Sequence, residues 1–243
     1  MYKRQVMEAL EEDGLGLDVG VGLVPIVPAA VLFDLAYKDF KIRPDKEMGK
    51  IAYKNASQKE NRQGIIGAGS GATVGKILGM DKAMKSGLGS ASLIEGDLIV
   101  SAIVAVNAFG DIFDYEKGLQ IGGPIVDGKM QKSTDIMKNI MTDFKGLANK
   151  NTTIGIVATN GKFDKTNLKK ISQMAHDGFA RSINPVHTGF DGDTIFSLAT
   201  NEIDADINLV GSMSATVMSR AIANAIYNLS LIHISEPTRL GMI

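Results

Sequence analysis

The sequence predicts an α/β fold in which helices cover sheets. Strand-like and helix-like segments alternate along the 243 residues, and no repeat or linker divides them. The strand-like segments are apolar at consecutive positions rather than at every second one. Strands that are apolar on both sides are typical of sheets whose two faces are covered. The chain is also long enough to bury the core of a single domain.

The first quarter of the chain predicts short helices around an apolar run. Residues 6–12 have the composition of a helix end. The apolar run at residues 19–33 is interrupted by glycines and prolines, so it is too short and too kinked to span a bilayer, and we expect it to be buried core. Residues 44–58 predict another short helix. Its expected inward-facing residues are Met48, Ile51 and Ala52.

The remainder of the chain predicts long strands and longer helices. Runs of β-branched and other apolar residues indicate the strands, and apolar residues near the helical period indicate the helices. The predicted strands lie within residues 93–107, 152–159 and 195–200, and the predicted helices at residues 165–183 and 214–227.

Composition excludes several classes of function. The formal net charge is −1, and the charged residues, 22% of the chain, form no blocks, so we expect no nucleic-acid or anionic-membrane partner. The chain has no cysteine, which excludes disulfides, a thiol nucleophile and cysteine-based zinc sites. This composition fits a cytoplasmic protein, although export stays open.

The junction Asn151-Thr152 carries the most chemical information. It lies where a polar run meets the predicted strand at residues 152–159. By itself such a pair is usually a plain loop-to-strand junction. If the chain cleaved itself there, however, Thr152 would carry both a hydroxyl and a free α-amine. That amine titrates near pH ~7.7–8.0, so it can act as the base for its own nucleophile.

Five segments that occur in a fixed order favour self-cleavage at that junction over a plain loop-to-strand junction. These segments are residues 24–35, 67–76, 106–111, 151–154 and 176–194. Through them the sequence resembles the L-aminopeptidase/D-esterase family of N-terminal-nucleophile hydrolases, called P1-family peptidases, over residues 6–227. β-Aminopeptidases and nylon-oligomer hydrolases belong to this family. The resemblance implies a four-layer α-β-β-α sandwich, truncated at the N-terminus.

Residues outside this region look foreign to the domain. Residues 1–5 and 229–243 resemble translations of a sequencing adapter on opposite strands. We therefore expect both ends to be non-native and exclude them from the fold. The single domain is then residues 6–227, with self-cleavage expected between residues 151 and 152.

The resemblance implies a set of catalytic residues. Thr152 matches the family's nucleophile, and Asn151 matches the residue whose carbonyl is attacked during maturation. Asn107 matches an amide that helps to hold the oxyanion, a kind of contact that can contribute ~3–4 kcal/mol. Its alternative role is to cap a turn at the end of a strand.

Two aspartates and a lysine complete this set. Asp191 and Asp193 match two aspartates of the nylon-oligomer hydrolases and could orient the amine of Thr152 or bind a substrate amine. The alternative is a simple Asp-Gly-Asp surface turn. Lys76 matches a lysine near the nucleophile, where it could lower the proton affinity of the hydroxyl or stabilise charge; the alternative is a solvated lysine at the end of a loop.

Other apparent motifs fail. The stretch ending at Lys76 lacks the glycine and the hydroxyl of a phosphate-binding loop, and residues 204–209 lack the glycine and the closing glutamate of a calcium loop. His176 and His187 lack the company of metal ligands, so we expect them to be packed or surface residues that position loops.

The predicted function is therefore a self-processing amidohydrolase or aminopeptidase that works through an acyl-enzyme. The family implies small peptide, ester or amide substrates, no metal or organic cofactor, and a homo-oligomer of processed αβ units. The alternative is a non-catalytic homologue that binds small amine ligands on the same fold. A metal-dependent peptidase is disfavoured because histidines are few and cysteines are absent.

Overall fold

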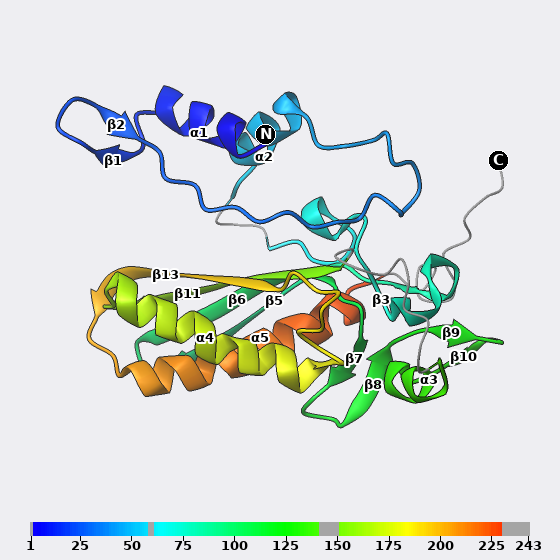
Figure 1. Cartoon of the computed structure of the whole chain (residues 1–243). Coiled ribbons are helices and arrows are strands. Elements are labelled where there is room, and N and C mark those ends of the chain that lie inside the picture. Colours follow the sequence, from blue (N-terminus) through cyan, green and yellow to red (C-terminus); the bar gives the residue numbers. More distant parts are fainter. Residues whose placement is uncertain (1, 58–60, 141–150, 230–243) are drawn as a thin grey trace. The chain divides into compact units, whose positions relative to one another are not determined.

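The computed structural model of the chain describes residues 2–57, 61–140 and 151–229. It contains two compact units, one of residues 1–31 and 39–61 and the other of residues 32–38 and 62–243 (Figure 1). The second unit holds most of the chain and every predicted site residue. Apart from Leu229, the predicted non-native segment 229–243 lies outside the described residues.

The first unit contains two helices and a two-stranded hairpin. Charged pairs link the helices: Lys50 Nζ lies 2.9 Å from Glu12 Oε1, and Lys46 Nζ lies 3.1 Å from Glu8 Oε2. The N-terminal helix confirms the helix predicted at residues 6–12, although it begins earlier. The elements are α1 (Tyr2–Glu12), β1 (Leu17–Asp18), β2 (Leu23–Val24) and α2 (Lys46–Lys54).

Two expectations for this part of the chain are wrong. Residues 19–33 were expected to be buried core, yet Val21 is 96% exposed and Ile26 is 67% exposed. The helix expected at residues 44–58 is present as α2, but it has no buried residue, and its expected inward-facing positions Met48, Ile51 and Ala52 are all exposed. Apolar periodicity marks the side of a helix that could be buried, but burial also requires a partner surface.

The second unit is built on a four-stranded sheet with the order β13-β11-β6-β5. β11 runs antiparallel to β6 and parallel to β13. Three predicted strands are thus confirmed, although the segment at residues 93–107 also contains the end of β5 and the turn that leads into β6. The strands are β5 (Leu88–Glu95), β6 (Leu98–Asn107), β11 (Thr152–Gly161) and β13 (Thr194–Ile203).

Helices α4 (Lys165–Ser182) and α5 (Ile207–Tyr227) pack side by side on one face of this sheet (Figure 1). Asp164 caps α4 by accepting from the Asn167 N–H, and Asp206 caps α5 in the same way. The helices approach closely because Gly178 has no side chain: a Cβ there would lie 2.5 Å from the Ala215 carbonyl oxygen. Both predicted helices are confirmed, and α5 begins seven residues earlier than expected.

The core lies between these helices and the sheet. It is formed by strand residues such as Val104 and Val157 and by helix residues such as Phe179 and Ile222, all fully buried. The α/β class is confirmed: α4 and α5 form a helix layer on the four-stranded sheet, and β12, β7 and β8 form a further three-stranded sheet. On the sheet strands, apolar residues at Ile94, Ile99, Ile156 and Leu198 are exposed.

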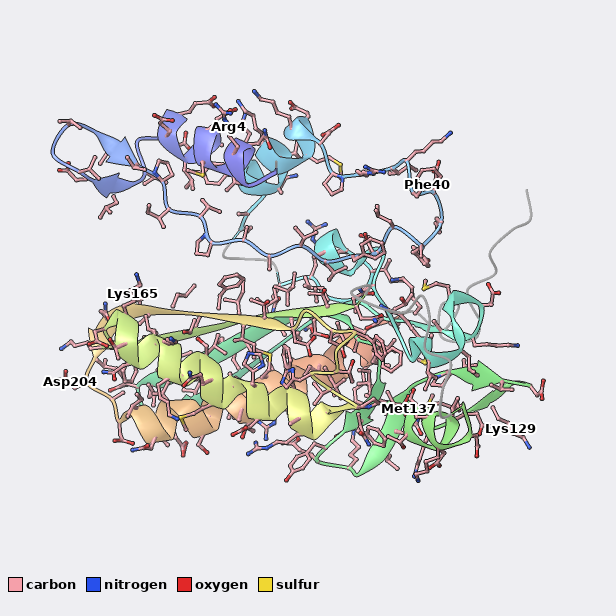
Figure 2. All side chains as sticks on the ribbon, in the orientation of Figure 1. Arg4, Phe40, Lys129, Met137, Lys165 and Asp204 are labelled. Atoms are coloured by element: carbon pink, nitrogen blue, oxygen red, sulfur yellow. The ribbon has the colours of Figure 1, made fainter. Side chains whose placement is uncertain are left out.

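Short elements surround one end of the sheet. Lys165, after β11, and Asp204, after β13, lie at the opposite end of the four-stranded sheet (Figure 2). Every helix in the described ranges falls short of what a membrane span requires. Besides three 3₁₀ turns, the short elements are β3 (Thr73–Val74), β4 (Met84–Lys85), β7 (Asp111–Asp114), β8 (Leu119–Gly122), β9 (Ile125–Val126), β10 (Lys129–Met130), α3 (Ser133–Ile140) and β12 (Ile183–Asn184).

Candidate active site

The Asn151-Thr152 junction is buried at the start of β11. Thr152 is 7% exposed and Asn151 is 3% exposed. The Asn151 carbonyl oxygen accepts two hydrogen bonds, one from the Thr152 hydroxyl at 2.5 Å and one from the Gly192 N–H at 2.9 Å. The hydroxyl therefore lies against the peptide group that precedes it, and a backbone donor polarises the carbonyl of that same group.

Gly192 can reach this position because it has no side chain. A Cβ on Gly192 would lie 3.1 Å from Thr152 Oγ1, which is tighter than most contacts of a real Cβ. Its chain neighbour Asp191 forms a parallel bridge with Asn151. The Asp-Gly-Asp segment is therefore an extension of the sheet edge at the junction, which argues against the alternative of a plain surface turn.

Asn107 lies opposite Thr152 at the end of β6. The two residues are direct partners across the antiparallel strands, so their side chains share one face of the sheet. Asn107 is 1% exposed, and its amide nitrogen donates to the Phe33 carbonyl oxygen at 2.8 Å. Its amide oxygen accepts from Lys76 Nζ at 2.6 Å and from the Thr73 N–H at 3.1 Å. This buried network fixes the orientation of the amide.

Lys76 is a buried amine rather than a solvated lysine at the end of a loop. Its side chain donates to both oxygens of Asn107, to Oδ1 and, at 3.1 Å, to the backbone carbonyl. Burial lowers the pKa of Lys76 to about 7; the charge of Lys85 adds to this effect, whereas Asp191 and Asp34 oppose it. Near neutral pH this amine is therefore divided between its charged and neutral forms.

Asp191 is held by donors from two sides. It accepts from the Phe109 N–H at 3.2 Å and from the Thr188 hydroxyl at 2.6 Å. Burial raises the pKa of Asp191, and the negative charge of Asp193 adds to the rise, while the bonds from Thr188 and Phe109 oppose it. A nearby cation would stabilise the ionised form of this buried carboxyl group.

Asp193 lies on the other side of Gly192. Its Oδ1 accepts from the Thr153 N–H at 2.9 Å, and its Oδ2 lies 2.9 Å from His187 Nδ1. His187 Nε2 in turn lies 3.2 Å from His176 Nδ1. The sequence analysis gave these histidines no catalytic role, because no other metal ligands accompany them in the sequence. The short separation of His187 from Asp193 along the chain was the available signal, but only the fold brings His176 of α4 to this loop.

A small cavity borders the junction. It has a volume of about 70 Å³ and is lined by residues that include Asp34, Lys76 and Asn151. A cavity needs about 10–15 Å³ to hold one water molecule, so this one admits several. The Asn151 side-chain oxygen is buried without a hydrogen-bond partner among the described residues. Within those residues, no group of three or more potential metal ligands comes together.

The structure thus brings together all the residues that the sequence analysis singled out. Asn107 and Lys76 lie on the β6 side of Thr152, and Asp191 and Asp193 lie on the β13 side. Their catalytic roles stay predictions.

Relatives of this chain include aminopeptidases and oligomer hydrolases. An uncharacterized aminopeptidase of Mycobacterium leprae is 37% identical over 210 residues, which are 82% of this chain and 56% of that protein. An uncharacterized aminopeptidase of Mycobacterium tuberculosis is 32% identical over 92% of this chain and 69% of its own length. A 6-aminohexanoate-oligomer endohydrolase of Paenarthrobacter ureafaciens is 30% identical over 79% of this chain and 59% of its own length.

Solved structures share the fold. A β-aminopeptidase of Burkholderia sp. superposes with a TM-score of 0.61 at 15% identity, over 94% of this chain and 64% of its own. The L-aminopeptidase D-Ala-esterase/amidase of Ochrobactrum anthropi, described as a variant of the N-terminal-nucleophile hydrolase fold, gives a TM-score of 0.52 at 17% identity, over 76% of this chain and 50% of its own. At this identity, these likenesses establish the fold alone.

The sequence pattern of one protein family matches nearly the whole chain, from residue 3 to residue 233. The chain spans little more than half the length of the curated relatives from Mycobacterium leprae and Paenarthrobacter ureafaciens. The family match and the shared fold confirm the resemblance drawn from the ordered motifs. This chain belongs to peptidase family S58.

Proposed function

We propose that this chain is an amide hydrolase that cleaves itself between Asn151 and Thr152 and then uses Thr152 as its nucleophile. One observation carries the proposal: the Asn151 carbonyl oxygen accepts from both the Gly192 N–H and the hydroxyl of the next residue. Family membership supports hydrolysis of amide bonds.

Self-cleavage begins when Thr152 Oγ1 attacks the Asn151 carbonyl carbon and gives up its proton. The Gly192 N–H donates to the oxygen that becomes negative, as a backbone donor of an oxyanion hole does. The bond between the carbonyl carbon and the Thr152 nitrogen then breaks, and the nitrogen takes a proton. Water hydrolyses the resulting ester, which leaves a carboxylate on Asn151 and restores the hydroxyl.

Lys76 is the base that we assign to this step. A neutral lysine amine carries two hydrogens, and the two oxygens of Asn107 accept two bonds from Lys76 Nζ. The lone pair of the neutral amine is then free to accept a proton. A pKa of about 7 gives a substantial neutral fraction at neutral pH.

Substrate hydrolysis uses the new α-amine of Thr152 as the base. The hydroxyl attacks an amide or ester carbonyl, the leaving amine or alcohol takes the proton, and water releases the acyl group from Thr152. Asn107 supplies a donor for the oxyanion: its amide nitrogen has two hydrogens, and the bond to Phe33 uses one. Asp191 and Asp193 stabilise the ammonium form of the amine.

The proposed substrates are short peptides and linear amide oligomers. The names of the relatives, aminopeptidase and 6-aminohexanoate-oligomer endohydrolase, support this class. We further propose a homo-oligomer of processed αβ units in the cytoplasm, with no cofactor and with neither nucleic acid nor membrane as a partner.

Mass spectrometry of the purified chain tests self-cleavage. The wild-type chain is expected to give fragments 1–151 and 152–243. T152A should stay as one chain because it lacks the attacking oxygen, whereas T152S keeps a hydroxyl and should still cleave. An uncut wild-type chain, or cleavage of T152A at the same bond, would overturn the proposal.

A further inference from the structure

Asp193 belongs to a chain of hydrogen-bonding groups that leads from the junction to helix α4. Its Oδ1 accepts from the backbone N–H of Thr153, the residue after the proposed nucleophile, at 2.9 Å. Its Oδ2 lies 2.9 Å from His187 Nδ1, and His187 Nε2 lies 3.2 Å from His176 Nδ1 on α4. These four groups connect β11, the loop that follows β12, and α4.

With both rings neutral and Asp193 ionised, the chemistry of these groups fixes the positions of their hydrogens. A carboxylate only accepts, so His187 Nδ1 carries a hydrogen and donates it to Asp193. In the neutral ring, Nε2 is then an acceptor, so His176 donates its own Nδ1 hydrogen to it. A hydrogen on His176 Nδ1 is thus compatible only with the ring form in which His187 donates to the carboxylate.

The hydrogen bond from His187 matters because the Asp193 carboxylate is buried. The Asp193 side chain is 4% exposed, whereas that of His187 is 40% exposed. A buried carboxylate needs donors in place of water, and the His187 ring supplies the donor for Oδ2. Contacts also hold the ring, because it packs against His176 at 4.8 Å and against Phe179 at 6.0 Å between centroids.

We infer that His187 is a positioning residue that holds the Asp193 carboxylate beside the start of β11, and that His176 keeps the His187 ring in the donating form. The catalytic importance of this arrangement rests on the proposed function, in which the start of β11, held by Asp193 through the Thr153 N–H, places the Thr152 hydroxyl against the Asn151 carbonyl. The hydrogen bond itself does not depend on that function.

NMR of the uncut T152A chain tests the hydrogen bond without reference to activity. The ring nitrogens of His187 should report a hydrogen on Nδ1, with slow exchange against water. D193A removes the acceptor, and H176F removes the donor to Nε2 while keeping a ring beside Phe179. Both variants should speed the exchange of that hydrogen. A hydrogen found only on Nε2 in T152A, or exchange unchanged by D193A, would refute the inference.

A matched pair of variants tests the positioning role. His187 has a φ of 52°, a left-handed conformation that both asparagine and glycine tolerate. H187N keeps a side-chain N–H close to the position of Nδ1, and H187G removes it. H187G should slow self-cleavage roughly ten- to hundred-fold, the range expected when a hydrogen bond to a charged group is lost. H187N should restore most of the rate.

The outcomes separate the two proposals. Equal rates for H187G and the wild type, or H187N as slow as H187G at equal melting temperature, would show that the donor has no positioning role. If the wild-type chain never cleaves, the proposed function fails, and the NMR measurement still decides the hydrogen bond between His187 and Asp193.

Discussion

At the Asn151-Thr152 junction, the proposed chemistry depends on the contacts of a few individual atoms. The Asn151 carbonyl oxygen meets a hydroxyl from Thr152 and an N–H from Gly192. The Lys76 amine lies against the Asn107 amide, directly across the strands from Thr152. These residues lie outside the apolar cluster between α4, α5 and the sheet, so a stability measurement on each variant can separate a loss of chemistry from a loss of folding.

The pH dependence of self-cleavage tests the role of Lys76. Burial lowers its pKa to about 7, so the amine gains a proton and loses its lone pair as the pH falls below that value. The rate should therefore fall about tenfold for each pH unit below 7 and level off above it. Rates measured by mass spectrometry from pH 5 to pH 9 would show this profile.

Two variants provide controls for that profile. K76R keeps a charge that is not lost at these pH values, and K76M has no amine, so both should cleave far more slowly than the wild type at every pH. A wild-type rate that is flat between pH 5 and pH 8, or rapid cleavage by K76R, would contradict the assignment of Lys76 as the base.

Gly192 offers a second test at the level of one residue. A methyl group there would lie 3.1 Å from Thr152 Oγ1, so G192A should displace the hydroxyl and slow self-cleavage by at least tenfold. G189A is the matched control because a Cβ at Gly189 meets nothing within 4 Å in the same loop. Equal cleavage rates for these two variants would show that the fit around Gly192 does not matter.

At the scale of elements, α3 is attached to β7 through one buried carboxylate. Asp111, 1% exposed, accepts from both the backbone N–H and the hydroxyl of Ser133, the first residue of α3. Burial raises the pKa of Asp111 to about 6, against the opposing effect of these bonds. The helix attachment therefore brings a titrating group into the core.

This carboxylate should make stability depend on pH. Because the folded-state pKa of Asp111 lies above its unfolded value, its contribution to stability is full below about pH 4 and is lost as the pH rises through about 6. D111N lacks this titration. The difference in unfolding free energy between wild type and D111N, measured by urea denaturation, should change by up to about 3 kcal/mol between pH 4 and pH 7. A constant difference would contradict the raised pKa.

The contact between α4 and α5 gives a prediction about packing. An exchange of glycine for alanine in a helix usually stabilises it by about 1 kcal/mol. At Gly178 the new Cβ would lie 2.5 Å from the Ala215 carbonyl oxygen, so G178A should instead destabilise the fold by about 1–3 kcal/mol. Urea denaturation measures this, with K170A at an exposed position of α4 as the control. A stabilised G178A would show that the helices can separate at little cost.

For the whole molecule, self-cleavage would divide elements that share one sheet. β5 and β6 lie before the junction, whereas β11, β13, α4 and α5 lie after it. β11 pairs with β6 along eight positions, and α5 packs on β5 and β6. The two fragments should therefore elute together in size-exclusion chromatography and separate only in denaturant. Separate elution under native conditions would contradict this prediction.

Local patterns predicted an element correctly where the fold supplies neighbours that cover it. The β-branched run at Thr152 became β11, and the helical period between Leu168 and Phe179 became α4, because a sheet and a helix face each other there. The same reasoning was wrong at Met48 and Ile51. Their apolar period is real, but no surface of the described residues covers them.

The sequence by itself determined the long strands β6, β11 and β13 and the helices α4 and α5, because periodicity is a property of the chain alone. Its ordered motifs predicted that Thr152, Asn107 and Lys76 belong to one site. Only the tertiary structure decided that Gly192 donates to the Asn151 carbonyl and that His187 holds Asp193. These contacts depend on strand register and on the packing of α4. A shift of one residue in register moves a side chain to the other face of the sheet, and no local pattern fixes such long-range pairs.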